Sequence, residues 1–411
     1  MAERNSPLIL GTEPIGKLLI QYSVPAIIAM TITSLYNIRD GIVIGHGVCA
    51  VAIACLAITF PLMNLVVAFC TLVGIGGATI SSIFLGQKDK VRATEVVHNV
   101  LIMCIINAVC FGGLTFLFLD SILLFFGASH DTLPYARDFM QVILLGTPIT
   151  YVFIGLNNVM RATGYPRKAM FSSLLTVGCN IILAPIFIFS FDWGIRGAAL
   201  ATVVSQTVAM VWVLVHFANK KNFIHFDRRY SRLKVRVVAK IFSIGMSPFL
   251  MNVCACVVVI FINNALQHTG GDLAIGAYGI VNRTLMLFVM IVMGITQGMQ
   301  PIVGYNYGAK QYDRVRKTLR YGITAGVVVT TVGFVLSELF PHAIVAMFTT
   351  SEELVDLSVT GLRISCAMFP FVGCQIVISN FFETIIVVIA VVVDFTDLLV
   401  YERSLVEYAY L

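Results

Sequence analysis

Charged side chains are scarce in this sequence. Only 12% of its 411 residues are Asp, Glu, Lys or Arg, whereas 58% are hydrophobic, and the mean hydropathy is +0.92. A water-soluble domain cannot bury so large an apolar fraction. The composition therefore excludes the soluble globular classes and predicts an integral membrane protein.

The sequence also lacks the motifs of the common enzyme classes. It contains no GxxxxGK[ST] phosphate-binding loop, so we do not expect ATP hydrolysis. The ten cysteines and seven histidines are dispersed, with neither disulfide nor metal-ligand spacing. Residues 1–13 have no apolar core before a cleavage site, so we expect no removable signal peptide. We therefore expect neither an enzyme nor a bound cofactor.

Long apolar segments are what the chain has in abundance. Crossing the hydrocarbon of a bilayer takes about 20 apolar residues as a helix. Ten segments meet this length, and they predict an all-α polytopic membrane protein: 18–45, 51–84, 96–118, 139–160, 169–191, 195–217, 241–268, 274–304, 318–340 and 355–382.

These segments are arranged as an internal repeat. The spacing of Lys17 and Pro25 is the same as that of Lys240 and Pro248, and further pairs keep nearly the same offset along the chain: Gly86 with Gly308, and Pro148 with Pro370. A repeat of membrane-length segments is typical of secondary transporters. It predicts two homologous six-helix lobes of parallel orientation, with a cavity between them near the membrane midplane.

The second copy of the repeat differs from the first at its end. We predict an N-terminal lobe at 14–217, an inter-lobe linker at 218–238, a C-terminal lobe with helices 7–10 at 239–384, and an aberrant tail at 385–411. The tail has no Gly or Pro, and it carries several acidic residues beside the single Arg403. We interpret it as the result of truncation or a frameshift that removes helices 11 and 12. A natural ten-helix variant is the alternative.

The basic residues occupy alternate loops. Of the 27 lysines and arginines, 21 lie within residues 1–17 and four stretches, at 88–92, 161–168, 220–240 and 310–320. The positive-inside rule predicts that these loops and the N-terminus are cytoplasmic. A nucleic-acid-binding patch is the alternative reading of 220–240, but a cytoplasmic linker explains its charge without a further partner.

An acidic residue inside the first apolar segment is the best candidate for ion coupling. A carboxylate at Asp40 would be costly in hydrocarbon, so we expect it to face a wet cavity or the protein interior and to accept a proton or Na⁺. Asn37 lies one turn earlier, and Asn180 and Thr202 offer neutral oxygens that suit a hard cation. The alternatives are a structural ion pair for Asp40 and helix–helix hydrogen bonds for the other three.

A second polar group interrupts the eighth segment. Asn282, Arg283, Gln297 and Gln300 are candidates for lining the substrate cavity, and Met286 adds a soft, adaptable surface. The alternatives are an arginine that extends toward the interface, a bent helix, and a methionine that packs against lipid or neighbouring helices.

Three stretches resemble the multidrug and toxic compound extrusion (MATE) family of cation-coupled antiporters, in a similarity that covers about residues 14–384. They are 36–45, then 180–189 with 194–202, and 297–310. The resemblance implies a twelve-helix, two-lobe fold that exports amphipathic, often cationic compounds in exchange for H⁺ or Na⁺. We also expect a multi-pass chain of the inner (plasma) membrane that acts as a monomer and binds no nucleic acid.

The same resemblance implies roles for single residues. Asp40 matches the acid of the N-terminal-lobe cation site, and Asn180 and Thr202 match its polar members. Ala184 stands where many relatives have a second aspartate, which leaves Asp40 as the main acid, and Arg39 replaces a residue that is commonly apolar. A lipid-linked saccharide flippase of the same superfamily and a truncated, non-transporting product are the competing functions.

Overall fold

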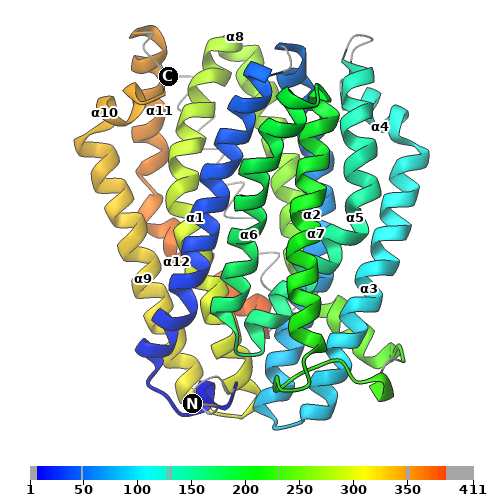
Figure 1. Cartoon of the computed structure of the whole chain (residues 1–411). Helices are drawn as coiled ribbons and strands as arrows, with labels where there is room; N and C mark the ends of the chain where they lie inside the picture. The colour runs from blue at the N-terminus through cyan, green and yellow to red at the C-terminus, as the bar shows by residue number, and fades with distance from the viewer. Residues whose placement is uncertain are drawn as a thin grey trace.

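The computed structural model describes residues 7–47, 50–126, 128, 132–230, 232–348 and 352–385. The side chains at 7, 37–47, 50–57, 228, 259–260, 263–264, 266–275 and 352 lie outside this description. The described residues form helices and no strand, and the long helices run side by side in one bundle (Figure 1). The described helices contain nine spans that are long and apolar enough to cross a membrane, or ten if one bent pair is a single span. The predicted all-α membrane fold is confirmed.

Seven α-helices form the first half of the bundle. Their apolar sequences favour helix because a helix satisfies every backbone N–H and C=O within itself, which hydrocarbon requires. A short 3₁₀ helix, η2, precedes them at Pro7–Gly11, and a π-helical turn, η3, follows the sixth at Ile186–Ser190. The α-helices are α1 Ile15–Gly47, α2 Ala50–Gly86, α3 Lys90–Leu117, α4 Leu119–Phe125, α5 Leu133–Ala162, α6 Pro166–Pro185 and α7 Gly194–Ala218.

The second half begins with a helix that doubles back on itself. After the short 3₁₀ helix η4 (Arg228–Tyr230), α8 runs from Val235 to Gly308, and a straight helix of its 74 residues would be about 110 Å long. Yet positions near both of its ends, Gly245 and Gly308, lie against the same C-terminal part of α2. The helix therefore reverses direction, and its two membrane-length arms are Val235–Val258 and Gly276–Gly308. These arms correspond to the predicted seventh and eighth segments.

The remaining helices repeat the pattern of the first half. They are α9 Tyr312–Leu339, α10 Pro341–Ala346, α11 Glu352–Cys366 and α12 Phe369–Ile385. Both α3 and α9 have 28 residues, and the turns before them place Lys88 and Lys310 at φ 60° and 59°. One difference is that α11 and α12 meet at a bend of 53°, whereas the corresponding α5 is continuous.

One end of the bundle, which we call the basic end, holds η2, the connecting residues 219–230 and 232–234, and the turns at 87–89, 163–165 and 309–311 (Figure 1, bottom). A single hydrophobic core there contains residues of both halves, among them Leu10, Val97 and Ile302. The opposite end has two separate cores, one from α2 and α4–α7 together with η3, and one from α8 and α10–α12. The halves are therefore packed together at the basic end and have their own cores at the other.

The predicted boundaries at 14–217, 218–238 and 239–384 stay predictions, although helix lengths and turn conformations follow the repeat. Of the tail predicted at 385–411, residues 386–411 lie outside the described residues.

Candidate functional site

Two of the predicted coupling residues meet between α6 and α7. The Asn180 amide Nδ2 donates a hydrogen bond to Thr202 Oγ1 at 3.1 Å, and Thr202 Oγ1 donates to the Ala198 carbonyl at 3.1 Å. Asn180 is only 2% exposed, and its Oδ1 has no hydrogen-bond partner among the described residues. This arrangement leaves a buried carbonyl-type oxygen free to accept a proton donor or a cation.

The residues around Asn180 Oδ1 determine how much negative charge a cation would meet there. Ala184 lies one turn beyond Asn180 on α6 and is fully buried, so this position contributes no second carboxylate. The helix that carries Asp40 and Asn37, α1, packs against α6 and α8. The side chains of Asp40, Asn37 and Arg39 lie outside the described residues, and the role predicted for Asp40 stays a prediction.

The predicted cavity residues on α8 fall into two groups. Asn282, Arg283 and Met286 lie near the start of its second arm, and Arg283 and Met286 are exposed. Gln297 and Gln300 lie at least 11 residues farther along, which is about 16 Å on a helix. The structure therefore does not bring the five residues together, and their common assignment to one cavity stays a prediction.

Gln297 and Gln300 connect the two halves of the chain. Arg161, in the last turn of α5, donates a hydrogen bond to Gln297 Oε1, and Gln300 Nε2 donates to Thr79 Oγ1 on α2 at 2.7 Å. Ser23 on α1 adds a third link, from its hydroxyl to the carbonyl of Ile295 at 3.3 Å. All three links lie in the stretch where the halves share a core. Arg161 was predicted only as part of a basic loop, and nothing in its local sequence indicates a partner 136 residues away.

Glycines permit an even closer approach between the halves. A Cβ added at Gly86 would lie 2.8 Å from the carbonyl carbon of Tyr305, and one added at Gly308 would lie 2.9 Å from that of Ile83. In the repeat Gly86 corresponds to Gly308, and Ile83 to Tyr305, so the two contacts are the same contact made twice. Small residues allow transmembrane helices to pack backbone against backbone. The α2–α8 junction is therefore closed tightly at the basic end.

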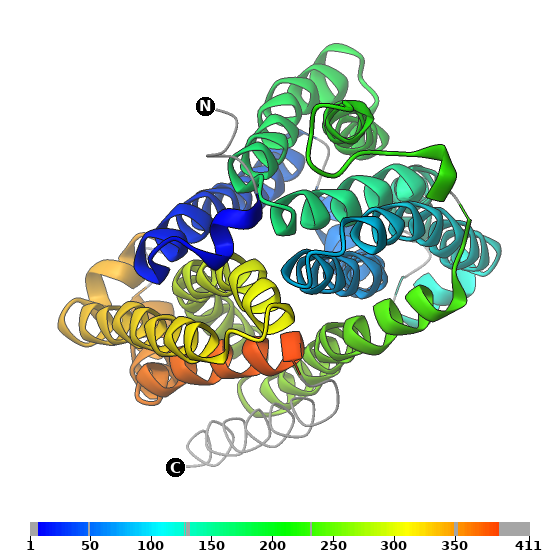
Figure 2. The same cartoon turned by 90° about the horizontal axis from the view of Figure 1, so that it is seen from below.

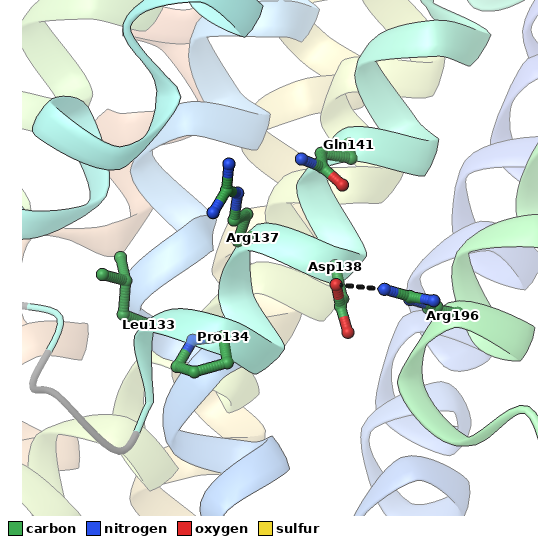
Figure 3. A pocket seen from close by; sticks show the side chains of 6 residues that line it. All are labelled: Leu133, Pro134, Arg137, Asp138, Gln141 and Arg196. Carbon is green, nitrogen blue, oxygen red and sulfur yellow. Dashed lines mark hydrogen bonds and ion pairs between the residues drawn. The ribbon is translucent and has the colours of Figure 1, made fainter.

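A pocket of about 340 Å³, drawn in Figure 3, lies at the end of the bundle opposite the basic end. It is lined by residues from the N-terminal turns of α5 and α7, and Arg196 pairs with Asp138 at 2.6 Å beside it. None of the residues predicted for the coupling site or the cavity lines this pocket. Its lining residues are Leu133, Pro134, Arg137, Asp138, Gln141 and Arg196.

Comparison with known proteins identifies the family to which this architecture belongs. The sequence model of the MatE family matches residues 25–186 and again residues 244–394, once in each half. The chain belongs to the MATE family. The two matches follow the internal repeat, and members of the family are transporters rather than enzymes.

Relatives of this MATE chain carry export names. It is 31% identical to the multidrug export protein MepA of Staphylococcus haemolyticus over 355 aligned residues. The alignment covers 85% of this chain and 77% of the relative. It is 28% identical over 356 residues to MepA of Staphylococcus aureus, over 86% and 78% of the two chains.

Solved structures share the fold. A MOP superfamily transporter from Pyrococcus furiosus superposes with a TM-score of 0.88 at 23% identity, over 98% of this chain and 89% of that one. A multidrug resistance MATE transporter in an outward-facing conformation gives a TM-score of 0.85 at 23% identity, over 97% and 86% of the chains.

Proposed function

We propose that this MATE protein exports amphipathic, often cationic compounds in exchange for H⁺ or Na⁺ by alternating access between its two halves. The export names of its MepA relatives support the substrate class. The internal repeat supports the mechanism, because rocking of two repeated bundles about a central site is how such folds commonly transport.

The observation that carries the proposal is the distribution of the hydrophobic cores. The halves share one core at the basic end, and each has its own core at the opposite end. Two bodies joined in this way are able to part at the opposite end without losing their internal packing, whereas parting at the basic end divides the core that they share. We propose that the described arrangement is the form closed at the basic end, and that transport includes a form in which this junction opens.

The charge distribution supports an orientation for this form. The basic end holds the loops that contain most lysines and arginines, so the positive-inside rule assigns it to the cytoplasm. We propose that the protein lies in the inner (plasma) membrane as a monomer, with its N-terminus in the cytoplasm and its separate cores toward the outside.

We propose that the coupling ion binds between α1 and α6. The unpartnered Oδ1 of Asn180 supports this position, and Asp40 on the neighbouring α1 would supply the negative charge. Thr202 holds the Asn180 amide so that its oxygen stays free. With Ala184 in place of a second acid, one carboxylate serves one proton or one Na⁺ in each cycle.

Replacing Thr202 with Val is expected to weaken binding of the coupling ion roughly tenfold, since the Asn180 amide loses its acceptor and turns. Folding should change little, because hydrogen bonds between transmembrane helices average about 0.6 kcal/mol. The measurement is the H⁺ or Na⁺ concentration that gives half-maximal efflux. Thr207→Val is the matched control, because Thr207 lies on the same helix and its hydroxyl donates to the Val203 carbonyl of its own helix. Equal ion dependence in the two variants would contradict the proposed site.

The test of the function is export by the 411-residue chain itself. An efflux-deficient bacterial host that expresses residues 1–411 should retain less of a fluorescent cationic dye than the host with an empty vector. Membrane fractionation checks that the protein is inserted. If inserted protein leaves dye retention unchanged, the proposed export of cationic compounds is wrong.

A further inference from the structure

The N-terminal segment of the chain is hydrogen-bonded to the second half, although η2 also packs against α2 of the first. The guanidinium of Arg314, in the first turn of α9, donates hydrogen bonds to the carbonyls of Leu10 at 3.0 Å and Glu13 at 2.7 Å. Its Nε donates to Asn306 Oδ1 at 2.8 Å, and the Asn306 amide donates to the same Leu10 carbonyl at 3.0 Å. We call these four residues the Arg314 cluster.

Packing reinforces this cluster. The side chain of Leu10 and the residue Asn306 are fully buried, and Leu10 belongs to the core that both halves share. A Cβ added at Gly11 would lie 2.9 Å from Cε1 of Tyr305, so η2 lies directly on α8. Figure 2, viewed from the basic end, shows the dark blue start of the chain beside the yellow ends of α8 and α9.

The segment that leads into the second half is fastened in the reciprocal way. Lys234 immediately precedes α8, and its backbone N–H donates to Asn99 Oδ1 on α3 at 2.8 Å. Its ammonium pairs with Glu95, also on α3, at 2.5 Å, and the Glu95 side chain is only 8% exposed. Helices α3 and α9 correspond in the repeat. Each lead-in segment therefore binds the third helix of the opposite half.

The hydrogen bonds of Arg314 are of a kind that can break when the basic end opens and form again when it closes. Within the described part of the chain this guanidinium has no carboxylate partner, and its bonds go to two carbonyls and one amide oxygen. Hydrogen bonds from a charged donor are strong, yet water replaces neutral acceptors readily once the contact is open to solvent. The corresponding Arg92 of α3 instead pairs with Asp89 one turn away at 3.2 Å, and its side chain is 60% exposed.

We propose that the Arg314 cluster is a gate of the transporter: its hydrogen bonds hold the halves together at the basic end, and they break each time that end opens. This role rests on the alternating access proposed above. Arg314 acts by positioning η2 and α1 against α8 and α9, not by contact with the transported compound. Lys234 and its partners on α3 form the second, reciprocal half of the same closure.

The test measures opening of the basic end without requiring transport. Ser82 is fully buried at the α2–α8 junction, where it faces Gly304. In purified protein in lipid nanodiscs, Ser82→Cys is alkylated with a water-soluble maleimide, and labelling at position 82 is quantified by mass spectrometry. Arg314→Gln should raise the labelling rate roughly tenfold, and Arg92→Gln should leave it unchanged. The buried native Cys104 should stay unlabelled in every variant, which verifies the fold.

A second variant separates loss of the gate from damage to α9. Gly11→Val leaves Arg314 intact but pushes η2 away from Tyr305, and it should raise labelling at position 82 as Arg314→Gln does. Unchanged labelling in both variants would overturn the gate. Because dye export is measured separately, raised labelling without export would refute the proposed function alone, and export with unchanged labelling would refute the gate alone.

Discussion

Asp40→Asn is expected to abolish ion-driven efflux while the protein remains folded in the membrane. Asn has the same shape as Asp but cannot take up a proton or neutralise Na⁺ at neutral pH. Because Ala184 provides no second acid beside Asn180, no neighbouring α6 carboxylate can replace the lost charge. Dye efflux from energised cells should fall to the level of the empty vector.

The matched control is Asp192→Asn. Asp192 is exposed in the turn before α7, and its φ of 55° is one that Asn adopts readily. This variant should export at the rate of the unmodified protein. Full efflux by Asp40→Asn would reject Asp40 as the coupling acid, and loss of efflux in both variants would indicate a general effect of removing acidic charge.

Gly86→Val is expected to cause the second large loss. The added side chain would overlap the backbone of Tyr305, which cannot rotate away as a side chain would. Overpacking of this kind costs about 1–3 kcal/mol, or roughly 5-fold to 150-fold in the population of the closed form. The repeat makes a further prediction: Gly308→Val should have the same effect, through the backbone of Ile83.

The measurements for these variants are the dye efflux rate and alkylation of Ser82→Cys. Both variants should export the dye slowly, and the cysteine at position 82 should be alkylated rapidly in both. Gly113→Val is the control, since Gly113 lies within α3 and a Cβ there meets no atom within 4 Å. If Gly86→Val exports as well as Gly113→Val, tight closure of α2 on α8 is not needed for transport.

The fold was largely predictable because its signals are local and repeated. Apolar length marks each spanning segment, and the spacing of Gly86 and Gly308 marks the repeat that the structure shows in equal helices and equal turns. The bend between α11 and α12 was not predicted. Pro370 lies near it, but Pro148 occupies the corresponding place in the continuous α5, so proline alone does not determine the bend.

The candidate site was predictable only in part, for a different reason. Asn180 and Thr202 are 22 residues apart on consecutive helices, so an antiparallel hairpin brings them together almost by necessity. The Arg314 cluster joins residues about 300 apart through backbone carbonyls. Every residue has such a carbonyl, so the sequence does not indicate which one accepts the bond. Gln297 was recognised as unusual in an apolar segment, but whether it faces a cavity or Arg161 depends on how the halves pack.

Export driven by an ion gradient in a defined membrane is the decisive measurement. The purified chain is reconstituted into liposomes, a fluorescent cationic dye is added, and a gradient of H⁺ or Na⁺ is imposed. Dye should move against the direction of ion flow at a rate that depends on the gradient, and Asp40→Asn should move no more than protein-free liposomes. Dye movement that is equal with and without either gradient, or equal in Asp40→Asn and the unmodified protein, would contradict coupled antiport.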